Sequence, residues 1–150
     1  TVETEAPIIV SNYIETFRGV IYPWHCDHQG HMTAMHYLGL FDQAFWHLYS
    51  AMGFTRSAME AAGCGFVTVK DTIEYRAEQS AGATLAIESG LTKVGNSSAV
   101  SYSVMRNSET DVIAATWENV SVYFDLNARE KTSLTQAERE RMNKHLVEAV

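Results

Sequence analysis

A short polar segment near the N-terminus concentrates the side chains that could do chemistry. His25, Asp27, His28 and His31 fall within seven residues, with Gly30 among them. Imidazole nitrogens and a carboxylate are ligands of Zn²⁺ or Fe²⁺, and a curled loop could bring them together. The spacing matches neither an HExxH signature nor an HxH pair, however, so we predict no metal site.

A catalytic use of this segment depends on the element that follows it. Apolar residues at steps of three and four, from Leu38 to Met52, predict an amphipathic helix over about 34–52, and Gly53 suits its C-terminal cap. The first N–H groups of a helix lack intrahelical partners and lie at the positive end of its dipole. They could hold an oxyanion while Asp27 attacks or activates water. The alternative is that Asp27 only caps the helix and the histidines face solvent.

The remaining elements predict an α+β fold in one domain, residues 1–150. Residues 1–12 are expected to form a loose arm, and Thr135 with Glu138 is a capping-box signature that opens a C-terminal helix over 135–148. A short helix near 57–62 is weakly indicated. Alternating or β-branched segments predict strands at 13–24, 67–75, 85–87, 100–104 and 112–124. We therefore expect an antiparallel sheet of about five strands wrapped around one long central helix.

Composition narrows the function classes. Hydrophobic residues make up 46% and charged residues 19%, as in an ordinary globular domain. Eleven Lys and Arg against 18 Asp and Glu give a charge of −7, which argues against a nucleic-acid partner. No apolar run is long enough to span a membrane and no basic signal segment is visible, so we expect a cytoplasmic protein without a membrane partner.

The segment DHQGHMTAMHY, from Asp27 to Tyr37, resembles the D-x-x-G-H-hydrophobic-N-N-x-x-Y pattern of hotdog-fold acyl-CoA thioesterases of the 4-hydroxybenzoyl-CoA thioesterase type. Weaker similarities follow in the same order, and the resemblance as a whole covers about residues 15–142. They lie at Tyr75, Gly82 and Leu85, at Gly95, Ser97 and Ser98, and at Val122 to Asp125.

This resemblance implies a hotdog fold and a thioester hydrolase, and it assigns roles along the motif. Asp27 would be the nucleophile or the general base, and the backbone N–H near Ala34 would bind the thioester oxygen. Gly30 would allow the tight turn, and His31 would orient Asp27 or the thioester. Thr33 and Ala34 stand where many relatives have two asparagines, so any orienting role there falls to the Thr33 hydroxyl.

The resemblance also implies contacts to the acyl group and the nucleotide. Trp24, Tyr37, Glu78, Ser97 and Ser98 are the candidate substrate-binding residues. Glu78, in place of the family's proline, is a candidate second carboxylate supplied across a dimer. Aromatic residues such as Trp24 would suit a short, aromatic or betainyl-type acyl group, the last through cation–π contact. The candidate partners of the CoA phosphates are Arg76, Lys93, Arg106 and Arg129.

CoA would enter as part of the substrate, so no cofactor is expected. The open edges of a small sheet favour pairing between copies, which predicts a homodimer or homotetramer. Two alternatives stay open. The first is a hotdog dehydratase or hydratase, which would need a D-x-N-x-x-H segment that the chain lacks at Asp27. The second is a non-catalytic acyl-CoA-binding domain, which would keep the fold without turnover.

Overall fold

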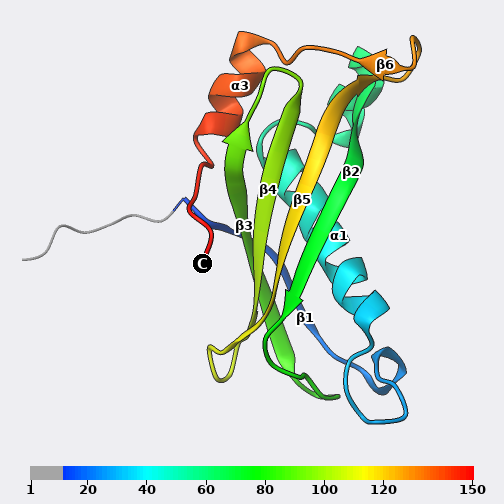
Figure 1. The fold of residues 1–150 in the computed structure, drawn as a ribbon, viewed down its shortest axis with the longest axis vertical. Coiled ribbons are helices and arrows are strands. Elements are labelled where there is room, and N and C mark those ends of the chain that lie inside the picture. Colours follow the sequence, from blue (N-terminus) through cyan, green and yellow to red (C-terminus); the bar gives the residue numbers. More distant parts are fainter. Residues whose placement is uncertain (1–11) are drawn as a thin grey trace, which may run out of the picture.

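The computed structural model describes residues 12–150, so the predicted arm at 1–12 lies outside the described residues except for Asn12. A curled antiparallel sheet, in the order β1-β3-β4-β5-β2 with β6 beside β5, wraps around helix α1 (Figure 1). The strands are β1 (Ile14–Val20), β2 (Cys64–Tyr75), β3 (Thr84–Val94), β4 (Ser98–Asn107), β5 (Ile113–Asp125) and β6 (Glu130–Lys131). The helices are η1 (Pro23–His25), α1 (Ala34–Ala51), α2 (Arg56–Ala62) and α3 (Gln136–Asn143).

Helix α1 forms the side of the core that faces the sheet and confirms the predicted central helix. Its buried face carries Phe41, Phe45 and Leu48, each at most 3% exposed. Phe41 stacks on Trp117 of β5 with ring centroids 5.6 Å apart. Burying side chains of this size contributes roughly 1.5–3 kcal/mol each. The sheet curls around α1 because that apolar stripe is the surface it must cover.

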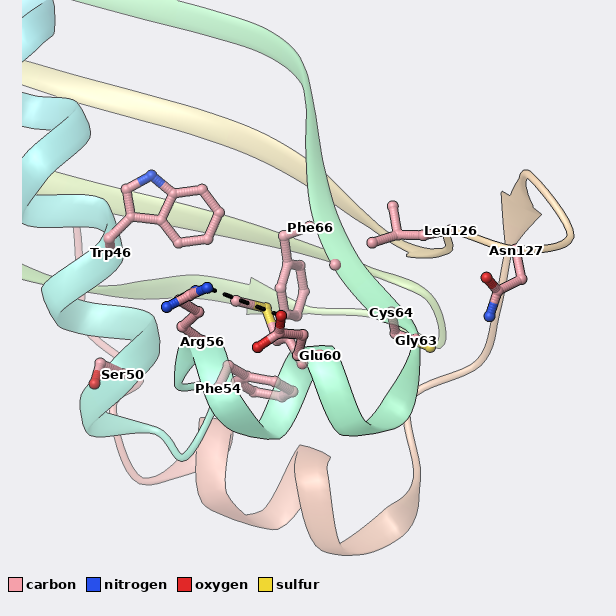
Figure 2. A pocket seen from close by; sticks show the side chains of 12 residues that line it. Trp46, Ser50, Phe54, Arg56, Glu60, Gly63, Cys64, Phe66, Leu126 and Asn127 are labelled. Carbon is pink, nitrogen blue, oxygen red and sulfur yellow. Dashed lines mark ion pairs between the residues drawn. The ribbon is translucent and has the colours of Figure 1, made fainter.

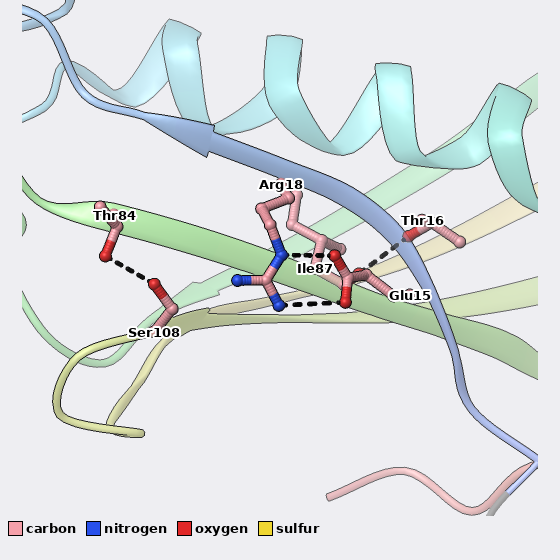
Figure 3. Close-up of polar contacts among 6 residues, drawn as sticks. All are labelled: Glu15, Thr16, Arg18, Thr84, Ile87 and Ser108. Carbon is pink, nitrogen blue, oxygen red and sulfur yellow. Dashed lines mark hydrogen bonds and ion pairs between the residues drawn. The ribbon is translucent and has the colours of Figure 1, made fainter.

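Strand β1 forms one edge of the sheet and pairs only with β3 (Figure 3). Thr16 donates through its hydroxyl to the Ile87 carbonyl at 3.2 Å. Arg18 binds both carboxylate oxygens of Glu15, at 2.7 and 3.1 Å. Because Glu15 and Arg18 both belong to β1, their ion pair does not join β1 to the sheet, and the attachment of β1 depends on its backbone ladder and on Thr16.

A carboxylate at the opposite edge satisfies two buried donors. Asp71 on β2 accepts from Trp117 Nε1 at 2.9 Å and from Asn119 Nδ2 at 2.8 Å. Trp117 is 2% exposed and Asn119 is 1% exposed, so each donor has little access to water. The contact therefore ties the outer strand β2 to the helix-facing side of β5.

The C-terminal helix is shorter than the predicted 135–148. Its start is confirmed, since Glu138 N–H donates to Thr135 Oγ1 at 3.1 Å and Thr135 N–H donates to Glu138 Oε1 at 2.8 Å. The helix ends at Asn143 because the backbone groups that follow form hydrogen bonds with β3 instead of continuing the helix. Leu91 N–H donates to the His145 carbonyl, and Val147 N–H donates to the Leu91 carbonyl, both at 2.8 Å.

Two short elements were not predicted, η1 and β6. The segment 13–24 was expected to be one strand, but β1 ends at Val20 and Pro23 begins η1, since proline suits the first helical position. The weakly indicated helix near 57–62 is confirmed as α2. None of the helices within residues 12–150 is long and apolar enough to cross a membrane.

Candidate active site

The segment from Cys26 to Met32 is a closed loop. Cys26 and Met32 face each other in an isolated antiparallel bridge. Asp27 N–H donates to the His31 carbonyl at 2.9 Å, and Gly30 N–H donates to the Asp27 carbonyl at 3.0 Å. Gly30 turns the chain with a φ of 83°, a conformation that glycine adopts without the steric cost of a side chain. These hydrogen bonds fix the position of Asp27 in the loop that directly precedes α1.

The Asp27 carboxylate is anchored by one oxygen. Oδ1 accepts from Gln29 N–H at 2.9 Å and, at 3.5 Å, from His31 N–H. No residue within 12–150 donates a hydrogen bond to Oδ2, so that oxygen is free to attack or to take a proton. The contacts are all within the loop, which excludes the alternative that Asp27 caps α1.

The first turn of α1 begins beside this loop. Thr33 has extended N-cap geometry, but its hydroxyl accepts no capping bond, and its N–H donates to the His25 carbonyl at 2.9 Å. Helix α1 has no acidic residue in its first turn. The positive end of the helix dipole, starting at Ala34, is therefore not neutralised by its own side chains.

Loop, helix and sheet line an open cavity of about 230 Å³. It brings together five of the predicted site residues, which are Asp27, His31, Ala34, Tyr37 and Glu78. Its other lining residues are Gln29, Met32, Tyr75 and Ala77. The cavity holds both a carboxylate with a free oxygen and the first residue of a helix, which are the two parts that acyl transfer requires.

Glu78 reaches the cavity from the same chain. Met32 N–H donates to the Gln79 carbonyl at 2.7 Å, and His31 forms an isolated bridge with Ser80, so the segment after β2 runs along the loop. Glu78 Oε2 lies 3.3 Å from His31 Nε2. Glu78 thus lines the cavity without a second chain. The His31 ring contacts Glu78, whereas only the His31 backbone contacts Asp27.

Two tyrosines form the aromatic wall of the cavity. The rings of Tyr37 and Tyr75 meet edge to face, with centroids 5.1 Å apart. Tyr37 is 4% exposed, and this burial raises the pKa of its hydroxyl, which therefore stays protonated at neutral pH. Tyr75 stands at the end of β2 and is 55% exposed.

A family model described as the thioesterase-like superfamily matches residues 21–148. The chain belongs to this superfamily. Its fold is the hotdog fold of thioesterases. No curated protein sequence matches it significantly.

Solved structures of this fold superimpose on most of the thioesterase-like chain. The Escherichia coli protein YbaW is 21% identical, with a TM-score of 0.74 over 87% of this chain and 97% of its own. A Staphylococcus aureus protein in complex with CoA is 14% identical, with a TM-score of 0.84 over 97% and 92% of the two chains. The 1,4-dihydroxy-2-naphthoyl-CoA thioesterase of Synechocystis is 16% identical, with a TM-score of 0.74 over 85% and 93%.

Several predicted residues lie outside the cavity of this thioesterase-like chain. Trp24 is on η1 and is 69% exposed. Thr33 is not among the lining residues. Ser97 lies in the turn between β3 and β4 and Ser98 begins β4, whereas the cavity borders the opposite end of the sheet, where β2 ends at Tyr75. Within one chain Ser98 instead closes its own turn, accepting from Gly95 N–H at 2.7 Å through its carbonyl.

The candidate phosphate partners are mostly occupied by other contacts. Arg76 donates to the Val150 carbonyl at 2.7 Å. Arg106 lies 4.0 Å from the Asp111 carboxylate, and Arg129 lies over the ring of Phe124, 5.4 Å from its centroid. Lys93 is exposed on β3. Among residues 12–150, no three His, Cys, Asp or Glu side chains are grouped as a metal site.

A larger cavity of about 660 Å³ lies at the other end of α1 (Figure 2). Trp46, Phe54, Met59 and Phe66 give it an apolar wall. Arg56 and Glu60, 3.9 Å apart, are its charged residues. Since α1 has 18 residues and is therefore about 27 Å long, this cavity and the Asp27 cavity are separate within one chain.

Proposed function

We propose that this protein is an acyl-CoA thioesterase of the 4-hydroxybenzoyl-CoA thioesterase type, which hydrolyses a thioester to a free acid and CoA. The observation that carries the proposal is the shared cavity of Asp27 and Ala34. Asp27 presents an oxygen without a hydrogen bond, and Ala34 begins a helix whose dipole is positive there. One good oxyanion donor contributes about 3 kcal/mol to acyl transfer.

Hydrolysis can follow two routes on these groups. With Asp27 as general base, Oδ2 takes a proton from water and the hydroxide oxygen bonds to the thioester carbon. The carbonyl electrons move to oxygen, beside the Ala34 N–H, and the C–S bond then breaks. The CoA thiolate leaves with the proton held by Asp27. With Asp27 as nucleophile, Oδ2 bonds to the carbon, the thiolate leaves, and water hydrolyses the mixed anhydride.

The test is thiol release from a panel of acyl-CoAs by Asp27→Asn. The amide keeps an acceptor for Gln29 N–H, so the loop retains its anchor while the carboxylate is lost. We expect kcat to fall by about 10²- to 10⁴-fold. Glu140→Gln, which removes a carboxylate from α3 away from the cavity, should leave kcat unchanged. Equal turnover by Asp27→Asn, or tight acyl-CoA binding by the wild type without thiol release, would contradict the proposal.

We also propose that the acyl group is cationic, of the betainyl type. The cavity lining contains the carboxylates of Asp27 and Glu78 and the rings of Tyr37 and Tyr75, but no lysine or arginine. In a betainyl thioester one methylene separates the trimethylammonium nitrogen from the carbonyl carbon. The cation must therefore lie in the same cavity as Asp27, where tyrosine faces and carboxylates favour it.

The matched comparison is betainyl-CoA against tert-butylacetyl-CoA, its neutral isostere. Cation–π contact contributes about 1–2 kcal/mol in a partly desolvated site, so we expect kcat/KM to favour betainyl-CoA by about 5- to 30-fold. Glu78→Gln should reduce this ratio, while Glu140→Gln, which removes a charge from α3, should not. Equal kcat/KM for the two thioesters would leave thioesterase activity intact and refute the cationic preference. Aromatic and short acyl-CoAs in the same panel would then identify the acyl group.

We further propose that the active form is at least a homodimer joined along β2. This strand is the edge of the sheet opposite β1, and it exposes Val67 (41%) and Val69 (61%). Met35 and Leu38 of α1 add apolar surface, 69% and 39% exposed, and line a groove together with β2 residues. Exposed apolar surface beside an unpaired edge favours association with a second copy.

Antiparallel pairing of two β2 strands would also join the two cavities. Cys64, at the start of β2, lines the large cavity, and Tyr75, at its end, lines the Asp27 cavity. In an antiparallel pair the start of one strand lies beside the end of the other. The apolar cavity of one copy would then extend the Asp27 cavity of its partner.

Light scattering tests this association. Val69→Asp places a charge in the middle of the edge and should give a monomer with reduced activity. Val112→Asp is the matched control, since Val112 is 50% exposed in the turn between β4 and β5, away from the edge. A fully active Val69→Asp monomer would overturn the proposal.

A further inference from the structure

An exposed aromatic stack stands beside the loop of Asp27 without entering its cavity. Tyr22 and Trp24 lie almost parallel, with ring centroids 4.5 Å apart and 7° between their planes. Trp24 is 69% exposed and Tyr22 is 47% exposed. Pro23 begins η1 between them and fixes the backbone that carries the two rings. The chain thus holds a flat aromatic surface toward solvent.

Two histidines continue this surface toward α1. His25 packs at a tilt against Trp24, with centroids 5.9 Å apart, and His36 meets the His25 ring edge-on at 5.1 Å. Tyr22 N–H donates to His25 Nδ1 at 2.9 Å. That contact uses the lone pair of Nδ1, so Nε2 of His25 carries the proton and is a donor.

The stack is held close to the Asp27 loop and to the start of α1. The His25 carbonyl accepts the N–H of Thr33, the residue before α1. Trp24 and Asp27 are three positions apart in the sequence, so their Cα atoms are at most about 11 Å apart. Figure 1 shows η1 beside the start of α1. A substrate that leaves the cavity on the side of η1 passes near this surface.

The chemistry of the surface suits a purine nucleotide. Every base presents a flat face that stacks on aromatic side chains. The sequence has no lysine or arginine between Arg18 and Arg56, so rings and imidazole donors are the groups that the loop and α1 offer to a nucleotide. A CoA thioester bound at Asp27 carries such a nucleotide at the far end of its pantetheine arm.

We propose that the Tyr22–Trp24 stack binds the adenine ring of the CoA thioester, with His25 and His36 facing its phosphates. The inference rests on the proposed thioesterase function and assigns its nucleotide subsite. Trp24 then acts on binding and not on the bond that breaks. Its loss should raise KM for substrates that carry the nucleotide and leave kcat nearly unchanged.

The experiment compares one acyl group on CoA and on N-acetylcysteamine, which lacks the nucleotide. For Trp24→Ala we expect KM for the CoA thioester to rise about 5- to 100-fold, with no change for the N-acetylcysteamine thioester. Trp24→Phe keeps an aromatic face and should restore most of the affinity. Val112→Ala is the control, since Val112 is 50% exposed in the turn between β4 and β5 and lies outside the stack.

The outcomes separate this inference from the proposed function. If Asp27→Asn abolishes hydrolysis of both thioesters while Trp24→Ala leaves their KM ratio at the wild-type value, the adenine subsite is refuted and the thioesterase survives. If the wild type hydrolyses neither, calorimetry with ADP decides: binding that Trp24→Ala abolishes supports the subsite, and absence of binding overturns it. A change of oligomeric mass in Trp24→Ala would show a subunit contact instead and would also overturn it.

Discussion

Gly30 controls the position of Asp27, so its replacement should affect both stability and activity. Its φ of 83° lies where an L side chain is strained, at a cost of about 1–2 kcal/mol. A Cβ built at Gly30 meets no atom within 4 Å, so steric overlap adds nothing. Gly30→Ala should therefore lower the free energy of unfolding by about 1–2 kcal/mol, or Tm by about 2–8 °C.

The loop can also relieve this strain by opening, and that would cost activity. Opening breaks the contacts of Gly30 N–H with the Asp27 carbonyl and of Asp27 N–H with the His31 carbonyl. A displacement of about 1 Å in a reacting group can cost about 100-fold in rate. We expect kcat for thiol release to fall at least about tenfold. Gly30→Asn should recover part of both losses, because asparagine tolerates positive φ.

Gly82 provides the matched control for this experiment. It has a φ of 92°, and its added Cβ also meets nothing within 4 Å. Its N–H donates to the Ile21 carbonyl, and neither Gly82 nor Ile21 lines the Asp27 cavity. Gly82→Ala should lose the same stability and keep kcat. If Gly30→Ala loses stability but retains full kcat, the tight turn does not position Asp27 and the reasoning is wrong.

Three further predictions concern the framework of the site. Asp71→Ala should lower the free energy of unfolding in urea by about 2–3 kcal/mol, because the buried donors of Trp117 and Asn119 lose their acceptor, whereas Asp71→Asn should cost less. Thr135→Ala should cost about 1 kcal/mol by removing the N-cap of α3, and equal urea midpoints would contradict this. Burial, with Lys144 nearby, lowers the pKa of His145. His145 therefore binds a proton more readily in the unfolded chain than in the folded one. The free energy of unfolding should fall as pH drops below about 6.5 and level off beneath the native pKa of His145. In thermal unfolding, His145→Gln should show a smaller loss of stability over the same pH range.

The sequence predicted what depends on local periodicity and on one continuous motif. The three- and four-residue spacing from Leu38 to Met52 defined α1 because only a helix places those side chains on one face. The motif around Asp27 and Gly30 defined the loop because both residues act within a few positions of each other. Fold class, central helix and loop were therefore predictable from short segments.

Residues that reach the cavity through distant pairing were harder to predict. Glu78 lies beside His31 because the segment after β2 pairs with the loop 49 positions earlier, and no local pattern encodes that register. Tyr75 was noted only as part of a strand motif, although the same pairing makes it a wall of the cavity. The end of α3 was misplaced for a similar reason. Its own sequence could continue the helix, but β3 competes for the backbone of His145 and Val147.

The negative charge of the protein should act in opposite ways on the two parts of the proposed substrate, the CoA and the acyl group. The chain carries −7 and the cavity adds the carboxylates of Asp27 and Glu78, so an anionic CoA is repelled at long range while a cationic acyl group is attracted at short range. Salt screens charges that are more than about 10 Å apart at 0.1 M, but it weakens contacts at a few ångströms much less. Raising the salt concentration should therefore lower KM for a CoA thioester and leave KM for the N-acetylcysteamine thioester nearly constant. A KM for CoA thioesters that rises with salt would instead mean that a cationic surface recruits the phosphates, and that the aromatic stack with its histidines is not the main nucleotide contact.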